Sequence, residues 1–236
     1  MTKAFIYYNL TNGVLAEMNA DEFPSRLYTW NDGTLNLSAD GTHFGYVWKG
    51  KSILNSPTSG VFTLKPGMYF SLPGSGTLCG DGQGIVITRL SYQGVFSIGG
   101  PVEPSGRLRY IDGSSDNLLI PPVLKGDPCL NALYFPPGIK QTMHLHDSIR
   151  VGMVVSGQGE CITHNEIIPL ELGQVLVIPA NSLHSFQTRN KGMVVVVYHP
   201  DSNYGPTHEN HPMILKTIVN GKSASLIPEI QTRALK

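Results

Sequence analysis

The chain has 236 residues, and its 17 basic and 17 acidic side chains give a formal net charge of zero. A chain with so few charges and no net charge creates no long-range field toward nucleic acid or an anionic membrane, so we expect neither partner. The 26 glycines and 17 prolines favour many short strands joined by tight turns.

The cysteines and the apolar runs indicate the compartment. Cys79, Cys129 and Cys161 are too few and too far apart for a disulfide framework or a thiolate zinc site. The N-terminal residues contain no apolar run of signal-peptide length, and no stretch approaches the roughly 18 apolar residues of a membrane-spanning helix. We therefore expect a cytoplasmic protein with reduced thiols.

Short runs of alternating apolar and polar residues recur from residue 26 onward, separated by turn residues such as Gly33, Gly41 and Gly67. No stretch has the 3.6-residue apolar period of an amphipathic helix, and residues 202–212, which contain Pro, Asn and Gly, are predicted to form a loop. The pattern predicts an all-β fold. The clearest predicted strands are residues 27–30, 34–37, 43–48, 61–64, 68–72 and 85–88.

The chain also contains an internal repeat. Four pairs of similar segments are separated by 106 to 108 residues, which indicates two copies of a barrel-sized β unit. We expect these units at residues 1–122 and 123–236, with the first strand of the second unit as a candidate for exchange into the first. The matched segments are 46–50 with 153–157, 64–73 with 170–179, 84–88 with 192–196, and 119–121 with 226–228.

Two histidines near the middle of the second unit define the candidate site. His144 and His146 are two residues apart, so on a strand their side chains point to the same face. We expect such a strand to run out of the Pro-Pro-Gly turn that ends at Gly138. His184 follows a second turn, after Gly173 and Pro179, and can complete a three-nitrogen set for one transition-metal ion.

These stretches resemble the paired motifs of the cupin superfamily, Gly-x5-His-x-His-x3-4-Glu-x6-Gly and Gly-x5-Pro-x-Gly-x2-His-x3-Asn. The sequence differs from them at Arg150, which replaces Glu, at Asn181, which replaces Gly, and at Thr188, which replaces the final Asn. The resemblance covers residues 25–230 and implies a bicupin of two tandem jelly-roll barrels. It further implies a divalent transition metal, with Fe(II) favoured and Zn, Mn, Ni or Cu as alternatives. The implied ligands are His144, His146 and His184.

The N-terminal unit lacks this set of histidines. With an offset of about 107 residues, His43 corresponds to Arg150, and the three ligand positions are occupied by Leu37, Ala39 and Leu78. One histidine cannot hold an ion, so we expect a degenerate, metal-free barrel that packs against the second or covers its opening.

Arg150 cannot ligate a cation, because guanidinium stays protonated and has no acceptor. Two interpretations remain open. Arg150 could bind the carboxylate of a small substrate beside a three-histidine metal, or it could form a structural ion pair with Asp147 or Glu160.

Tyr198 and His199 end the apolar strand at 194–197, where either could reach the cavity as an acid–base or hydrogen-bonding group. Together with the resemblance, these residues favour an Fe(II) dioxygenase that acts on a small, anionic, carboxylate-bearing molecule. The alternatives are a metal-dependent isomerase, epimerase or lyase, and a binding cupin without catalysis. The resemblance also leaves open a homodimer formed through barrel sheets.

Overall fold

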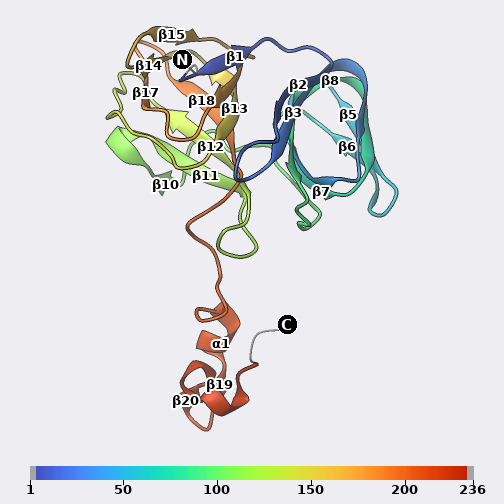
Figure 1. Cartoon of the computed structure of the whole chain (residues 1–236), viewed down its shortest axis with the longest axis vertical. Helices are drawn as coiled ribbons and strands as arrows, with labels where there is room; N and C mark the ends of the chain where they lie inside the picture. Colours follow the sequence, from blue (N-terminus) through green and yellow to red (C-terminus); the bar gives the residue numbers. More distant parts are fainter. Residues whose placement is uncertain (1–3, 233–236) are drawn as a thin grey trace.

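The computed structural model describes residues 4–232 and shows two β-barrels that lie side by side (Figure 1). The predicted all-β fold of two tandem barrels is therefore confirmed. The first barrel is built on a strongly bent eight-stranded antiparallel sheet around a core that includes Leu54, Phe70 and Leu78. Its strands are β2 (Gly13–Met18), β3 (Ser25–Leu37), β4 (Gly41–Lys49), β5 (Ser52–Ser56), β6 (Gly60–Leu64), β7 (Tyr69–Pro73), β8 (Gly76–Leu90) and β9 (Ser97–Gly99).

The second barrel pairs a seven-stranded sheet with a three-stranded sheet. Its core lies between the two sheets and includes Phe135, Cys161 and Phe186. The large sheet has the order β1 (Ile6–Tyr8), β16 (Val175–Ile178), β13 (Arg150–Gly157), β18 (Met193–His199), β12 (Cys129–Phe135), β11 (Ser115–Ile120) and β10 (Leu108–Arg109), and the small sheet has the order β15 (Ile167–Leu170), β14 (Gly159–Thr163) and β17 (His184–Gln187).

Strands from the N-terminal half complete the second barrel. β1 pairs antiparallel with β16, and Phe5 just before it is buried in the core of the second barrel. β11 pairs with β12 and carries β10 at its outer edge. Segments that precede residue 122 therefore belong to the large sheet of the second barrel, so the exchange runs opposite to the one considered from the sequence.

The two barrels pack through one shared apolar core. Side chains alternate along β18 and β13, so Val196, Tyr198 and Val151 point away from the inside of the second barrel. They meet residues of the first barrel that include Leu27 and Phe44. The first barrel therefore packs against the outer face of the same sheet whose inner face lines the candidate site.

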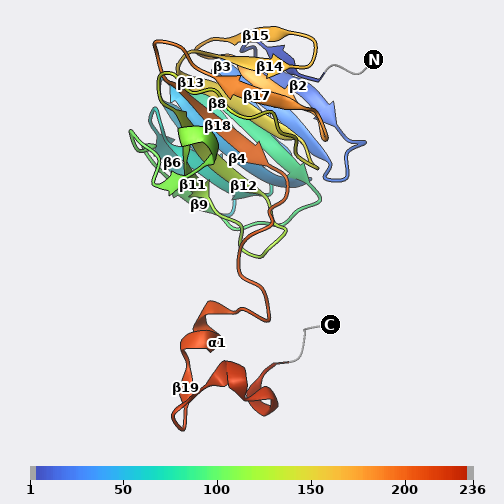
Figure 2. The same cartoon turned by 90° about the vertical axis from the view of Figure 1, so that its left-hand side faces the viewer.

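Beyond residue 206 the chain leaves both barrels. Residues 207–232 form a C-terminal arm that extends away from them in both views (Figures 1 and 2). The arm contains a one-turn helix, α1 (Pro212–Lys216), a small hairpin of β19 (Ile218–Val219) and β20 (Lys222–Ser223), and two short 3₁₀ segments, Ala224–Leu226 and Pro228–Ile230.

The arm changes the extent of the second unit. The strands of the second barrel end at His199, and residues 201–206 still contact it through Asp201 and through hydrogen bonds to residues 125 and 126, so it is residues 207–232 that are not part of it. Residues 226–228, which the repeat matched to residues 119–121 at the end of β11, lie in the arm, and that pair of segments is therefore not structurally equivalent. Within residues 4–232 no helix has the length and apolarity needed to cross a membrane.

Candidate metal centre

His144 and His146 lie on an extended segment between β12 and β13, and His184 begins β17. The sequence predicted a strand for this segment, but it pairs with β17 only at two isolated positions, Lys140 with Gln187 and His144 with His184. Three residues lie between Lys140 and His144, but only two lie between His184 and Gln187 on β17. The extra residue acts as a bulge that interrupts the ladder, so the regular strand expected here is replaced by an irregular extended segment.

The three imidazoles converge on one point. Their ligand nitrogens all lie within 4.8 Å of one another. The ring centroids of His144 and His184 are 4.7 Å apart, and that of His146 is 5.2 and 5.3 Å from the other two. The grouping of these histidines in space matches the grouping expected from their spacing.

Hydrogen bonds fix the tautomers of two of the rings. Nδ1 of His144 lies 2.8 Å from the carbonyl oxygen of Thr142, and Nδ1 of His184 lies 2.8 Å from that of Ser182. A carbonyl oxygen only accepts, so each Nδ1 carries a proton and Nε2 is the nitrogen left to bind an ion. Nε2 of His184 is buried and has no hydrogen-bond partner among the described residues.

The surroundings keep the imidazoles of His146 and His184 neutral. Burial lowers the pKa of His146 to about 3 and that of His184 to about 4, and the nearby Arg150 guanidinium and the other histidines add to the effect. Neutral imidazole is the form that binds metal ions. Three converging imidazole nitrogens, one of them buried without a partner, fit a divalent transition-metal ion with coordination positions left open.

Arg150 is the first residue of β13 and lines the same cavity, with 11% of its side chain exposed. Its Nη1 donates to the carbonyls of Ser148 (3.2 Å) and Ile149 (2.8 Å) and to the Ser148 hydroxyl (2.6 Å), and lies 3.8 Å from a carboxylate oxygen of Asp201. Its Nε is buried and has no partner among the described residues. One edge of the guanidinium is therefore held by the protein, while Nε remains available to a ligand.

The two acidic partners considered from the sequence do not pair with Arg150. Among the ion pairs of residues 4–232, Arg150 is joined to Asp201 and to neither Asp147 nor Glu160. Glu160 instead pairs with Arg189 at 2.9 Å. The structural ion pair therefore exists, but with a partner that lies beyond β18 in the sequence.

Tyr198 and His199 point in opposite directions because side chains alternate along β18. His199 lines the cavity, its Nε2 is buried without a partner among the described residues, and burial holds its pKa well below the usual range. Tyr198 is fully buried in the core between the barrels. Its ring centroid is 5.4 Å from that of Phe44, and its hydroxyl is 3.4 Å from that of Ser25. Of the two residues considered from the sequence, His199 therefore reaches the cavity, and Tyr198 is corrected to a core residue.

The cavity has a volume of about 70 Å³, and part of its wall was missed by sequence reasoning. Tyr110 and Asp116 come from the segment assigned to the first unit, so their position could not be inferred from the repeat. Asn131 had a usable signal, because it is a lone amide in the apolar strand β12. Besides the three histidines, Arg150 and His199, the lining comprises Tyr110, Asp116, Asn131, Leu133, Gln141, Leu176, Ile178, Phe186 and Val197.

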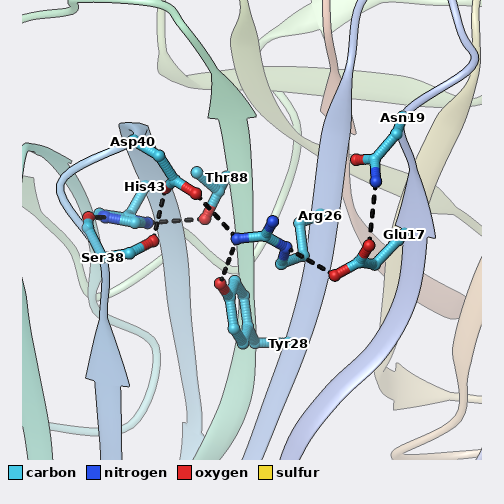
Figure 3. Close-up of polar contacts among 8 residues, drawn as sticks. All are labelled: Glu17, Asn19, Arg26, Tyr28, Ser38, Asp40, His43 and Thr88. Carbon is cyan, nitrogen blue, oxygen red and sulfur yellow. Dashed lines mark hydrogen bonds and ion pairs between the residues drawn. The ribbon is translucent and has the colours of Figure 1, made fainter.

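In the first barrel His43 has a structural role. Its Nδ1 lies 2.6 Å from the hydroxyl of Thr88, and its Nε2 lies 2.8 Å from the carbonyl of Ser38, so both ring nitrogens are already engaged. Figure 3 shows the surrounding polar contacts, in which Asp40 accepts from Arg26 at 2.9 Å. These contacts leave His43 without a lone pair for an ion.

Strand pairing corrects one of the expected equivalences between the barrels. Leu37 pairs with Gly76 in the first barrel, as His144 pairs with His184 in the second. The counterpart of His184 is therefore Gly76, two residues before the position taken from the repeat. Neither Leu37 nor Gly76 can ligate a metal.

The family model described as a cupin domain matches residues 133–200, which include the whole histidine cluster. The C-terminal barrel is a cupin domain. No curated protein matches the chain.

Solved structures resemble the cupin domain and the N-terminal barrel together, which is consistent with the two-barrel fold. The protein Ylba from E. coli is 20% identical, with a TM-score of 0.58 and coverage of 88% of this chain and 95% of that chain. A cupin 2 conserved barrel domain protein from Leptotrichia buccalis is 13% identical, with a TM-score of 0.57 and coverage of 85% and 92%. A salicylate 1,2-dioxygenase from Pseudaminobacter salicylatoxidans is 12% identical, with a TM-score of 0.58 and coverage of 79% and 75%.

Proposed function

We propose that this protein is a metal-dependent enzyme that acts on a small carboxylate-bearing molecule, with an Fe(II) dioxygenase reaction as the favoured chemistry. The observation that carries the proposal is the convergence of three imidazoles on a cavity that also contains the unpartnered Nε of Arg150. His144, His146 and His184 would hold the ion. When bound, the ion would supply Lewis acidity and, as Fe(II), the electrons for reaction with O₂.

Arg150 would orient the substrate. Its Nη1 is held by Ser148, Ile149 and Asp201, so the guanidinium is fixed before any ligand arrives. A buried guanidinium close to a metal ion is unfavourable unless an anion lies between them. A substrate carboxylate meets that requirement and accepts a charge-assisted hydrogen bond from Nε. The salicylate 1,2-dioxygenase of similar fold is named for a substrate that carries a carboxylate.

A second candidate is a metal-dependent isomerase, epimerase or lyase that does not use O₂. It is favoured by Asp116, whose carboxyl lines the cavity and whose pKa is raised to about 6 by burial. A carboxyl with such a pKa can hold or release a proton near neutral pH. His199, whose pKa is lowered by burial, would then stay neutral and would contact the substrate through a hydrogen bond at Nε2.

Metal analysis and oxygen uptake test the proposal. Protein purified without chelators and offered Fe, Zn, Mn, Ni and Cu should bind about one ion per chain, and the Fe(II) form should consume O₂ with a small carboxylic acid. Turnover without O₂ would reject the dioxygenase and support the second candidate. Failure to bind any of these metals would reject both.

The role of Arg150 has its own test. Arg150→Gln should raise KM for the substrate by more than about tenfold, because it removes a charge-assisted hydrogen bond, and leave metal content unchanged. Arg189→Gln is the matched control, since Arg189 is an exposed arginine outside the cavity. Loss of metal in Arg150→Gln with KM unaltered would contradict the anchoring role.

A further inference from the structure

Unpartnered polar atoms are concentrated on one cavity. Among the described residues six buried side-chain nitrogen or oxygen atoms have no hydrogen-bond partner, and five of them belong to residues that line the cavity of the cupin domain. A buried polar atom without a partner costs about 1–3 kcal/mol, so such a concentration is expected where a ligand supplies the partners. The five atoms are Nε2 of His184, Nε2 of His199, Nε of Arg150, Oδ1 of Asp116 and Oδ1 of Asn131.

Two of these atoms are acceptors that lie together. Nδ2 of Asn131 is 2.9 Å from Oδ2 of Asp116. A carboxylate oxygen only accepts, so the amide nitrogen of Asn131 must face Asp116, and the remaining oxygen is Oδ1. Oδ1 of Asp116 and Oδ1 of Asn131 therefore form a pair of acceptors that need donors from elsewhere.

The donor group lies across the sheet from these acceptors. Arg150 is on β13 and Asp116 is on β11, with β18 and β12 between them. Both side chains reach the cavity from the same inner face. A ligand that satisfies both must carry an acceptor toward β13 and donors toward β11.

From this arrangement we propose that the substrate is a small amino acid, whose carboxylate binds Arg150 and whose amino group binds Asp116 and Asn131. A hydroxyl group has one hydrogen and can satisfy only one of the two acceptors, whereas an amino or ammonium group has enough hydrogens for both. The opposite charges of Arg150 and Asp116 match those of a zwitterion. This inference rests on the proposed function only in taking the cavity as a substrate site, and it concerns residues that are not metal ligands.

Binding measurements on matched compounds test the inference without turnover. Calorimetry under anaerobic conditions would compare each of several amino acids, from glycine to glutamate, with the acids that carry hydrogen or hydroxyl in place of the amino group. At least one amino acid should bind about tenfold or more tightly than both of its analogues, the factor expected for a charge-assisted hydrogen bond. If no amino acid binds better than its analogues, or none binds at all, the inference is rejected.

Variants identify the side chains responsible. Asp116→Asn should reduce the preference for the amino compound to less than about threefold, while affinity for the unsubstituted acid is retained. Asn131→Ser is a second variant in case Asp116→Asn folds poorly, and should weaken the same preference. Glu166→Gln, at an exposed position outside the cavity, should change nothing. A preference that survives both cavity substitutions would overturn the assignment.

Repeating the titrations with metal-loaded and metal-free protein separates this inference from the proposed function. A metal-binding protein without amino preference would retain the proposed function and reject the amino-acid substrate. A protein that prefers amino compounds but binds no metal would retain the amino-acid substrate and reject the proposed function.

Discussion

Position 150 shows how a single residue changes the chemistry of a familiar motif. The cupin motif has a glutamate there, which would add a negative ligand to the metal, whereas this chain has a guanidinium that repels cations. The fold holds it through backbone carbonyls, Ser148 and Asp201, so part of its charge is neutralised away from the histidines. The unpartnered Nε of Arg150 then favours the binding of an anion beside the histidines.

Removal of one imidazole should abolish metal binding. His146→Ala leaves two ligands and is expected to lower metal affinity by at least about a hundredfold, because one of the three metal–nitrogen bonds is lost. Metal content after dialysis, measured by plasma emission, would show the change. His164→Ala, at an exposed histidine of the same barrel, should retain the metal. Equal losses in both variants would show that the ion binds elsewhere.

His43 provides a contrasting prediction in the first barrel. His43→Ala removes a fully buried side chain with hydrogen bonds at both nitrogens. The free energy of unfolding, measured by chemical denaturation, should therefore fall by about 1–3 kcal/mol. The metal content should stay that of the wild type, because His43 belongs to the other barrel. A loss of metal from a folded variant would contradict the assignment of the site to the second barrel.

Asp116 should give the protein a specific pH dependence. Its pKa is raised to about 6 in the folded protein, above that of the unfolded chain, so the stability that this group contributes is fully present below about pH 4 and is lost as pH rises through 6. Asp116→Asn has no such titration. In metal-free protein the variant should therefore gain stability relative to the wild type between pH 4.5 and 7.5, by on the order of 2 kcal/mol. If the difference in denaturation midpoint between the variant and the wild type stays constant across this range, the pKa of Asp116 is not raised by folding.

At the residue scale the sequence predicts what local spacing determines. The grouping of His144, His146 and His184 follows from their spacing within one barrel, and the structure brings them together. The wall formed by Tyr110 and Asp116 depends on a strand contributed by the other half of the chain, which no local pattern encodes. The orientation of Tyr198 depends on which face of β18 meets the first barrel, and the sequence gives no register for that contact.

Among the secondary-structure elements, the turns are better predicted than the strand register. Gly138 and Gly173 both occur where the motif requires turns, and both have positive φ, of 81° and 86°. The bulge between Lys140 and His144 and the pairing of Leu37 with Gly76 were missed, because neither an unpaired extra residue nor a pairing displaced by two residues changes which residues along a strand share a face with one another.

The two motif glycines should differ in their tolerance of a methyl group. A Cβ at Gly138 would meet no atom within 4 Å, whereas a Cβ at Gly173 would lie 2.5 Å from the ring of Trp48 in the first barrel. Gly138→Ala should therefore cost about 1–2 kcal/mol, from backbone strain alone. Gly173→Ala should cost distinctly more, because the contact between the barrels must also shift. Chemical denaturation measures the loss of unfolding free energy in both variants. Equal losses would mean that the Trp48 side chain moves away without destabilising the protein.

For the molecule as a whole, the sequence predicts two barrels but not how they share strands. The repeat in the apolar pattern gives the number and approximate size of the units. It does not show that β1 crosses to the second barrel, since a three-residue strand has no pattern of its own. Nor does it show that the barrel strands end at His199, because residues 226–228 in the arm repeat the sequence of residues 119–121.

The two ends of the chain should respond differently to truncation. Deletion of residues 1–9 removes β1 and the buried Phe5, which exposes the edge of β16 and part of the second core, and should cost more than about 3 kcal/mol. Deletion from residue 207 onward removes the arm, whose described hydrogen bonds all lie within residues 207–232. That variant should therefore keep the melting temperature and metal content of the full chain, as differential scanning calorimetry and metal analysis would show. A large loss of stability in the second variant would mean that the arm packs onto the barrels of this or another copy of the chain.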